Sequence, residues 1–304
     1  MLCKVSRNEL RLRGYVSPKL VFKIVRVKSK KNDSENRRNA SRVKLDLDKA
    51  QSEAVAIISA YKDLQNYYEN PNMITFGDHV EGCRYISSNE EVKSSLPDVK
   101  SHFMASETTN SDRDYIIDTI RNSGGNILNQ HSVAKEGINI NNLHGSIIGR
   151  NMSIISLQQS IGRSDRGLYS DLLKLNKGEI SLDDPKGWDK YYNIIYVIVD
   201  SDESFYQRVK EIVGYLLGEG IPENEWDISE LDDDGKGGSE YKKPDFSPTI
   251  STSFSFDKKK FQQMIQQAKI ELIEEYKSIQ SKLEDEQKRE KLDSMSKLDL
   301  INRL

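Results

Sequence analysis

The sequence predicts an α/β domain with a parallel β-sheet flanked by helices, on three observations. Short strand-like segments alternate with helical segments between residues 45 and 216. The helical segments carry apolar residues at three- and four-residue spacing, which is typical of helices with one buried face. The segment 193–200, NIIYVIVD, is rich in the β-branched residues that favour strands. Strands that alternate with helices imply right-handed crossovers and a parallel sheet.

The individual elements follow from the same patterns. Strands are expected over 20–27, 72–78, 99–106, 125–132, 144–151 and 193–200. Helices are expected over 45–68, 80–96, 111–124 and 156–166. Within the first of these helices, the apolar residues that recur at helical spacing, and should therefore face the core, are Ala54, Ile57, Ile58 and Tyr61.

Charge and composition divide the chain into four parts. Residues 1–44 are expected to be a basic connector or arm, since they contain 14 lysines and arginines but only three acidic residues. Residues 45–218 form the α/β domain, and the acidic residues 219–256, with Gly and Pro, are expected to be a flexible linker. Residues 257–304 predict a long amphipathic helix that docks on a partner or self-associates. Its apolar stripe consists of Phe261, Ile265, Ala268, Leu272, Tyr276, Ile279 and Leu283.

Several classes of protein are excluded by composition. Two cysteines, Cys3 and Cys83, are too few for a disulfide framework or a zinc site. The four histidines show no metal-ligand spacing, so no metal site within this chain is expected. No apolar run approaches the roughly 18 residues that a membrane span needs, and no signal peptide is visible. We therefore expect a soluble cytoplasmic protein, and the uneven charge suggests a nucleic-acid partner.

The segment 157–167, LQQSIGRSDRG, is the strongest candidate for a functional site. With Ser156 as the N-cap, Gln159 completes a capping box. Gln159, Arg163 and Arg166 then share one helix face, and Gly162 leaves that face unobstructed. Two guanidinium groups on an open face suit a polyphosphate, because each offers planar, always-charged donors. The alternative is a solvated helix face with two ordinary arginines.

Order and spacing of several segments resemble the C-terminal RecA-like domain of a superfamily 2 helicase. The segment 159–166 resembles the last motif of that superfamily, Q-x-x-G-R-x-x-R. AKEGINI at 134–140 resembles the preceding motif, MITFGD at 73–78 the first motif of the domain, and ASETTNSDRDYIIDTI at 105–120 the segment after it. Over residues 9–215 the chain looks most like the UvsW-type DNA helicases of large bacteriophages.

The resemblance implies roles for individual residues. Arg163 and Arg166 correspond to arginine fingers that act on ATP together with Gln159. The residues implied in nucleotide contact are Lys135, Gly137, Asn139 and Gly162. The residues implied in nucleic-acid contact are Gly77, Asp78, Thr108, Thr109 and Arg113, for which ordinary βα loops are the alternative. Trp188, Tyr191 and Tyr192 could stack on bases, or else pack before the last strand.

One position departs from the family pattern. Asp165 stands between the two arginines, where the family has apolar or small residues. A carboxylate at this place is expected to pair with Arg163 or a nearby lysine, which would weaken one phosphate contact. Arg166 is therefore the less secure of the two arginine fingers.

The other half of an ATPase site is missing from the sequence. A phosphate loop requires G-x-x-x-x-G-K-[ST], and the one glycine that precedes a lysine, Gly235, has Glu230 where the motif needs glycine. The apolar strand that ends in Asp200 imitates an acidic box but follows the arginine motif. The expected function is the C-terminal half of an ATP-dependent DNA helicase, sharing ATP and Mg²⁺ with a motor half on another chain. The alternative is a non-enzymatic DNA- or protein-binding module derived from a helicase.

Overall fold

The seven strands of the protein form one all-parallel sheet in the computed structural model, which describes residues 6–27, 47–131, 140, 142–150, 152–200, 202–231, 263–274, 277–278 and 281. The strands run in the order β3-β4-β2-β5-β6-β1-β7. Their bounds are β1 Lys19–Arg26, β2 Asn72–Phe76, β3 Lys100–Met104, β4 Asn126–Gln130, β5 Gly145–Ile148, β6 Tyr192–Val199 and β7 Trp226–Glu230. The parallel pairing confirms the predicted α/β fold with a parallel sheet.

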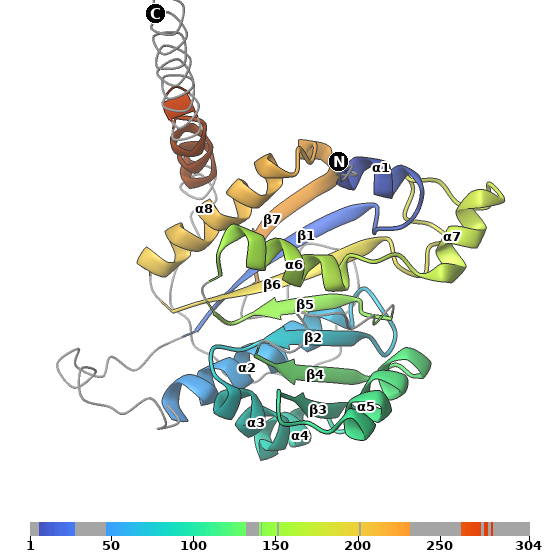
Figure 1. Ribbon diagram of the computed structural model, residues 1–304, viewed down its shortest axis with the longest axis vertical. Helices are drawn as coiled ribbons and strands as arrows, with labels where there is room; N and C mark the ends of the chain where they lie inside the picture. The colour runs from blue at the N-terminus through green and yellow to red at the C-terminus, as the bar shows by residue number, and fades with distance from the viewer. Residues whose placement is uncertain are drawn as a thin grey trace, which may run out of the picture.

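Helices cover both faces of this sheet, giving three layers (Figure 1). Helices α2, α3 and α4 pack on one face, and α5, α6 and α8 pack on the other. The helices are α1 Arg7–Leu12, α2 Leu47–Leu64, α3 Val80–Ser88, α4 Glu90–Ser95, α5 Asn110–Asn122, α6 Ile154–Ser164, α7 Tyr169–Asn176 and α8 Asp202–Gly218, with a short 3-10 turn η3 at Glu223–Glu225. No helix in the described part of the chain is both long and apolar enough to cross a membrane.

Two apolar clusters, one on each face, hold the layers together. The sheet strands supply alternate residues to the two sides, since successive side chains of a strand point to opposite faces. In β1, Phe22 belongs to the cluster under α5, α6 and α8, whereas Val21 belongs to the cluster under α2, α3 and α4. The predicted core residues of α2 are buried, with Ala54 and Tyr61 fully inaccessible.

Two strands lie outside the range expected for the folded domain. β1 comes from the basic segment 1–44 and pairs with both β6 and β7, so this part of the segment is a central strand of the sheet. β7 comes from the acidic segment 219–256 and pairs with β1. The physical reason is burial: six of the eight residues of β1 are buried, and the five apolar side chains among them outweigh the surrounding charges.

Local capping also differs from expectation at two helices. The range 80–96 was expected to be one helix, but Asn89 ends α3 and caps α4, accepting hydrogen bonds from the N–H groups of Glu91 at 2.9 Å and Val92 at 3.1 Å. Thr109 caps α5 and accepts a hydrogen bond from the N–H of Asp112 at 3.2 Å. Asn and Thr are favoured N-caps because a short side-chain oxygen meets the free N–H groups of the first turn.

The first described turns of the C-terminal helix, residues 263–274, lie against the domain (Figure 1). Ala268 is fully buried, and Ile265 and Leu272 pack against the cluster formed by β7 and α8. Lys210 of α8 pairs with Glu271 at 3.5 Å. This part of the predicted stripe is therefore covered by the chain itself, while Phe261, Tyr276, Ile279 and Leu283 lie outside the described side chains.

A buried polar network ties β1 to the helix that follows it. Lys23 Nζ donates to both carboxylate oxygens of Asp63 in α2, at 2.6 and 2.7 Å, and Tyr196 Oη of β6 donates to the same carboxylate at 2.7 Å. Lys23 and Asp63 are each 5% exposed, so neither charge can be solvated if its partner is removed.

We therefore predict that Lys23→Met lowers the free energy of unfolding by about 3–5 kcal/mol, because Asp63 is left as a buried unpaired charge. The measurement is urea-induced unfolding followed by circular dichroism. Lys62→Met, at a partly exposed position of the same helix α2, is the control and should change stability by less than about 1 kcal/mol. Equal losses in the two variants would contradict a structural role for the buried pair.

Candidate functional site

The arginine helix α6 begins one turn earlier than the sequence suggested. Its N-cap is Ser153, whose hydroxyl accepts a hydrogen bond from the N–H of Ser156 at 3.3 Å. The expected cap at Ser156, and with it the capping box with Gln159, is therefore wrong. Ser153 is the better cap because the two isoleucines after it extend the helix, which places Ser156 inside the first turn.

The helix presents Gln159 and Arg163 on its accessible side, but it ends at Ser164, so Arg166 lies in the turn after it and not on the predicted helix face. Leu157 and Ile161 are buried against the sheet, while Gln159 and Gly162 are exposed. A Cβ atom added at Gly162 would meet no heavy atom within 4 Å, so the space above this residue is open. Gly162 therefore leaves room for another group to approach the backbone of the helix closely.

The two guanidinium groups lie close enough to affect each other. Arg163 and Arg166 are both partly exposed. Burial lowers the pKa of Arg163 below its usual value, and the positive charge of Arg166 lowers it further. Both effects disfavour the charged form, and a bound anion between the two groups would relieve the repulsion. The arrangement therefore favours a ligand that carries several negative charges.

The residue between the arginines is anchored from a distant part of the sequence. Asp165 does not pair with Arg163, as had been expected, but accepts hydrogen bonds from Arg7 of α1, to Nε at 2.9 Å and Nη2 at 3.2 Å. Arg7 and Asp165 are 4% and 3% exposed. Burial by itself lowers the pKa of Arg7, but the carboxylate of Asp165 outweighs it, so the pKa lies above its usual value. Asp165 thus fixes the arginine segment and leaves Arg163 to other contacts.

The backbone around Asp165 is held by further contacts. Lys190 is fully buried and donates from Nζ to the carbonyl oxygens of Ser164 and Arg166, the latter at 2.7 Å. Desolvation lowers the pKa of Lys190 to about 7. The N–H of Ser17 donates to the carbonyl oxygen of Asp165 at 2.9 Å. The turn that carries Arg166 is therefore positioned from three separate segments of the chain.

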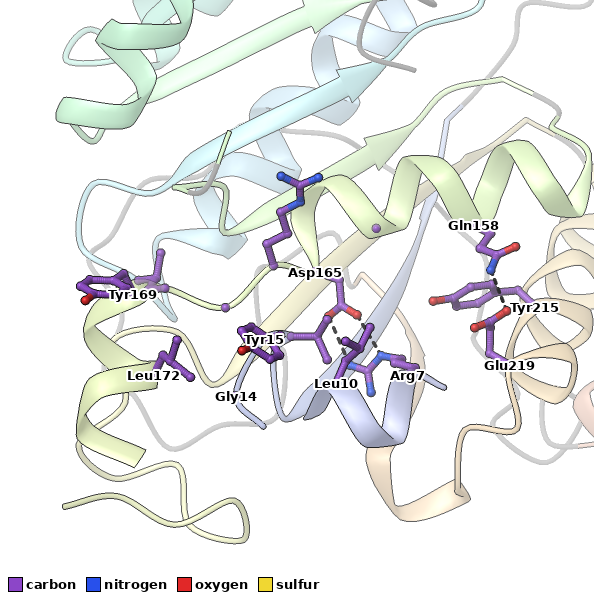
Figure 2. A pocket seen from close by; sticks show the side chains of 15 residues that line it. Arg7, Leu10, Gly14, Tyr15, Gln158, Asp165, Tyr169, Leu172, Tyr215 and Glu219 are labelled. Carbon is purple, nitrogen blue, oxygen red and sulfur yellow. Dashed lines mark hydrogen bonds and ion pairs between the residues drawn. The ribbon is translucent and has the colours of Figure 1, made fainter. Parts of the chain in front are cut away.

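A groove of about 650 Å³ opens beside this turn (Figure 2). Its walls come from α1 and the loop after it, from the end of α6, from α7 and from the end of α8. Gly162 and Arg166 line it, so it is continuous with the arginine face. Tyr15 and Tyr169 also line it and are 54% and 72% exposed. Exposed aromatic rings beside a groove are typical of a surface that another molecule covers.

The residues implied in nucleic-acid contact lie in loops after β2 and β3. Gly77 follows β2, where a Cβ atom would lie 2.5 Å from Cys83 Sγ, so glycine is required for packing. Thr108 Oγ1 accepts a hydrogen bond from the N–H of Ala105 at 2.9 Å. Arg113 Nη2 donates to the carbonyl oxygens of Ala105 at 3.3 Å and Ser106 at 3.2 Å. Together with the cap at Thr109, these side chains build the loop after β3.

The structure places the arginine turn and the residues implied in nucleic-acid contact at different ends of the strands. The backbone of Arg166 bridges to Val16, shortly before β1 begins, whereas Gly77 and Thr108 follow the ends of β2 and β3. Because all strands are parallel, their amino-terminal ends lie together on one side of the sheet and their carboxyl-terminal ends on the other. The arginine turn lies at the amino-terminal ends, and the loops after β2 and β3 lie at the carboxyl-terminal ends. Any nucleic-acid contact at Thr108 would therefore be made away from the arginine face.

Two further sets of predicted residues have different outcomes. Lys135, Gly137 and Asn139 lie outside the described residues. The aromatic side chains before β6 are engaged with their own loop: Trp188 Nε1 donates to the carbonyl oxygen of Ser181 at 2.8 Å, and Tyr191 Oη donates to that of Leu182 at 2.9 Å. These hydrogen bonds hold the rings of Trp188 and Tyr191 against the loop before β6.

Sequence reasoning missed the residues that position the site. Arg7 and Lys190 looked like ordinary basic residues, and only tertiary contacts reveal their partners. The described residues contain no cluster of histidine, cysteine or acidic side chains suited to a metal ion.

Comparison with known proteins gives similar folds at low identity. No protein-family model and no curated protein sequence matches the chain. The chain is similar to the ATP-dependent Type ISP restriction-modification enzyme LlaBIII bound to DNA, with a TM-score of 0.49 and 13% identity, over 75% of this chain and 16% of that one. It is similar to Dbp5 of S. cerevisiae bound to RNA and ADP BeF3, with a TM-score of 0.45 and 12% identity, over 76% of this chain and 45% of that one.

A third similar structure is domain 2 of the DEAD-box helicase Mss116p bound to an RNA duplex. Its TM-score is 0.42 at 13% identity, over 72% of this chain and 66% of that one. The chain thus spans less than half of the length of LlaBIII and Dbp5. At these identities and TM-scores, the likenesses assign neither a family nor an activity to the chain.

The buried pair beneath the arginine segment leads to a prediction about stability. Asp165→Asn removes the nearer of the two carboxylates that pair with the buried Arg7, leaving Glu225 at 3.5 Å, and should lower the free energy of unfolding by about 1.5–3 kcal/mol. Glu9→Gln is a matched control, because Glu9 pairs with Arg13 at 2.7 Å on the surface and such pairs contribute only about 0–1 kcal/mol. Chemical denaturation of the two variants gives the comparison, and similar small losses would refute the anchoring role of Asp165.

Proposed function

We propose that the chain is the C-terminal half of an ATP-dependent superfamily 2 helicase or translocase of the UvsW type. In this proposal a motor half on another chain supplies the phosphate loop and the acidic box. This chain supplies Arg163 and Arg166 as arginine fingers, with Gln159 on the same helix face. DNA is the nucleic-acid substrate. The alternative is a DNA- or protein-binding module without catalytic function.

The observation that carries the proposal is the open arginine face of α6. Arg163 at the end of α6 and Arg166 in the turn after it are both partly exposed, and the space above Gly162 is open. The turn that carries Arg166 is fixed from behind by Asp165 and Lys190. Rigidly held cationic donors aimed at a transferring phosphoryl group stabilise charge in the transition state without reorganisation.

The groove beside Arg166 supports a protein partner at this site. In an ATPase site shared between two RecA-like domains, the second domain must be covered by the first where the arginines meet the nucleotide. The exposed rings of Tyr15 and Tyr169 lie where that cover would be. In this proposal Arg163 and Arg166 contact ATP, and the motor half holds Mg²⁺.

The first test is ATP hydrolysis with and without a motor half. We expect no turnover by the chain alone, and DNA-stimulated turnover when it is mixed with a superfamily 2 motor half that carries a phosphate loop. Arg163→Ala should lower kcat of the mixture by about 10³-fold or more, because an arginine finger contributes that much to phosphoryl transfer. Turnover by the pure chain, or full activity of the Arg163→Ala mixture, would refute the two-chain site.

A second test measures the effect of one substitution, Gly162→Ala, on protein stability and on ATP turnover separately. Gly162→Ala should raise thermal stability slightly, since alanine is favoured over glycine in a helix by about 1 kcal/mol and its Cβ enters open space. The same substitution should lower ATP turnover of the mixture, because the methyl group fills the face on which the nucleotide is proposed to lie. Gly82→Ala in α3, also a helical position with no atom near the added Cβ, is the matched control.

The outcome is read from the two glycines together. Higher stability in both variants with loss of activity in Gly162→Ala alone supports a ligand on the arginine face. Unchanged turnover in Gly162→Ala would show that nothing approaches this helix closely, which favours the non-enzymatic alternative.

A further inference from the structure

The α7 segment, residues 169–190, is built around a fully buried carboxylate, that of Asp171. Asp171 Oδ1 accepts a hydrogen bond from the N–H of Asp189 at 2.7 Å, and Oδ2 accepts one from the N–H of Lys190 at 2.8 Å. Lys174 Nζ lies 4.0 Å from Oδ1 but binds Asp189 more closely, at 2.6 Å. One side chain of α7 therefore holds two consecutive amide groups that follow 18 and 19 positions later in the chain.

The burial of this carboxylate costs free energy. Burial raises the pKa of Asp171, and the hydrogen bonds from the two N–H groups only partly offset this effect. A carboxylate removed from water is disfavoured unless strong partners replace the water. For Asp171 those partners are the amide groups of Asp189 and Lys190. The carboxylate therefore contributes to the fold by fixing the backbone at these two residues.

Lys190 extends from this fixed backbone to the arginine turn, residues 164–167. Its Nζ donates to the carbonyl oxygen of Ser164 and, at 2.7 Å, to that of Arg166. Lys190 is 1% exposed, so water cannot replace these acceptors if the backbone of the lysine shifts. The carboxylate of Asp171 therefore acts on the arginine turn through Lys190.

The rest of the α7 segment gives Asp171 a fixed support. Lys174 Nζ donates to the carbonyl oxygen of Gly187 at 3.0 Å, and Ser170 Oγ donates to the carboxylate of Asp189 at 2.6 Å. These bonds join the helix to the end of the loop that follows it. The α7 segment lies beyond the starting ends of the strands, on the side of α1 (Figure 1). It is therefore braced from within, although it lies outside the sheet.

We propose that Asp171 is a positioning residue for the arginine fingers, because it fixes the backbone of Lys190, whose Nζ holds the arginine turn. The inference rests on the proposed function for the reaction that Arg163 and Arg166 serve. It adds a residue from outside the segment that resembles the last helicase motif. An aspartate in the first turn of a helix is ordinarily explained by the helix dipole, so the sequence alone gives Asp171 no further role.

The test is hydrogen exchange of the full chain, which needs neither a partner nor a nucleotide. The amides of Asp165 and Gly167 report on the arginine turn, because each donates to a carbonyl oxygen at 2.9 Å. Asp171→Asn replaces one acceptor oxygen by an amide nitrogen, which cannot accept the second N–H. Exchange of both reporter amides should become about tenfold faster or more, as expected when a hydrogen bond to a charged group is lost.

The control is Asp183→Asn, the same chemical change at an exposed position of the α7 segment. This variant should leave exchange of the reporter amides unchanged. Equal exchange in Asp171→Asn and Asp183→Asn would overturn the proposal, because the buried carboxylate would then have no effect on the arginine turn.

A double-mutant cycle distinguishes action through Lys190 from a general loss of stability. Lys190→Met removes the donor group and keeps an apolar side chain of similar length, and alone it should also speed exchange of the reporter amides about tenfold or more. Added to Lys190→Met, Asp171→Asn should speed exchange no further, because its path to the arginine turn is already broken. Multiplied effects in the double variant would overturn the proposal. If Lys190→Met does not fold, Lys190→Gln, which is uncharged and one atom shorter than lysine, takes its place in the cycle.

A second arm measures ATP turnover of the mixture with a motor half. Asp171→Asn should lower kcat about tenfold or more and leave KM for ATP within about twofold, because misplaced arginines weaken the transition state more than ground-state binding. A raised KM with unchanged kcat would overturn the positioning role. The exchange measurements require no ATP hydrolysis, so an inactive mixture would refute the proposed function, while the support of the arginine turn by Asp171 would still be decided by exchange.

Discussion

The buried ion pair between Arg7 and Asp165 is the constraint on which the arginine site depends. A carboxylate removed from water must be paired, and its partner comes from a helix 158 positions earlier in the sequence. The same pairing draws α1 and the start of β1 against the end of α6. The identity of residue 165 therefore bears on the place of the N-terminal segment as much as on the arginines beside it.

Fixing the turn in this way has a chemical consequence. A guanidinium on a mobile loop loses conformational entropy each time it binds, whereas one on an anchored backbone has lost most of that freedom during folding. Lys190 adds to the anchoring because it donates hydrogen bonds to the carbonyl oxygens of Ser164 and Arg166. Carbonyl groups at the end of a helix have no partner within the helix. The protein thus supports Arg166 with buried polar contacts that contribute to folding before any ligand arrives.

The parallel fold and the buried face of α2 could be predicted because both depend on local periodicity. Ala54 and Tyr61 were assigned to the core by spacing alone, and both are buried. The partner of Asp165 could not be predicted, since spacing along a helix says nothing about a guanidinium from another segment. β1 was recognised as a strand, but its charged neighbours concealed its central position.

The position of β1 also determines when the domain can form. The second element along the chain is an inner strand, and its two neighbours are among the last to be synthesised: Leu20 lies opposite Asn193 of β6 and Trp226 of β7. Such distant pairing gives a high contact order and slow folding. On the ribosome, the apolar residues of β1 must wait until about 200 further residues have emerged, which takes about 10 to 40 s at bacterial and eukaryotic rates. During that time β1 is an unpaired strand, and chaperones that bind extended apolar segments have an obvious target in the nascent chain.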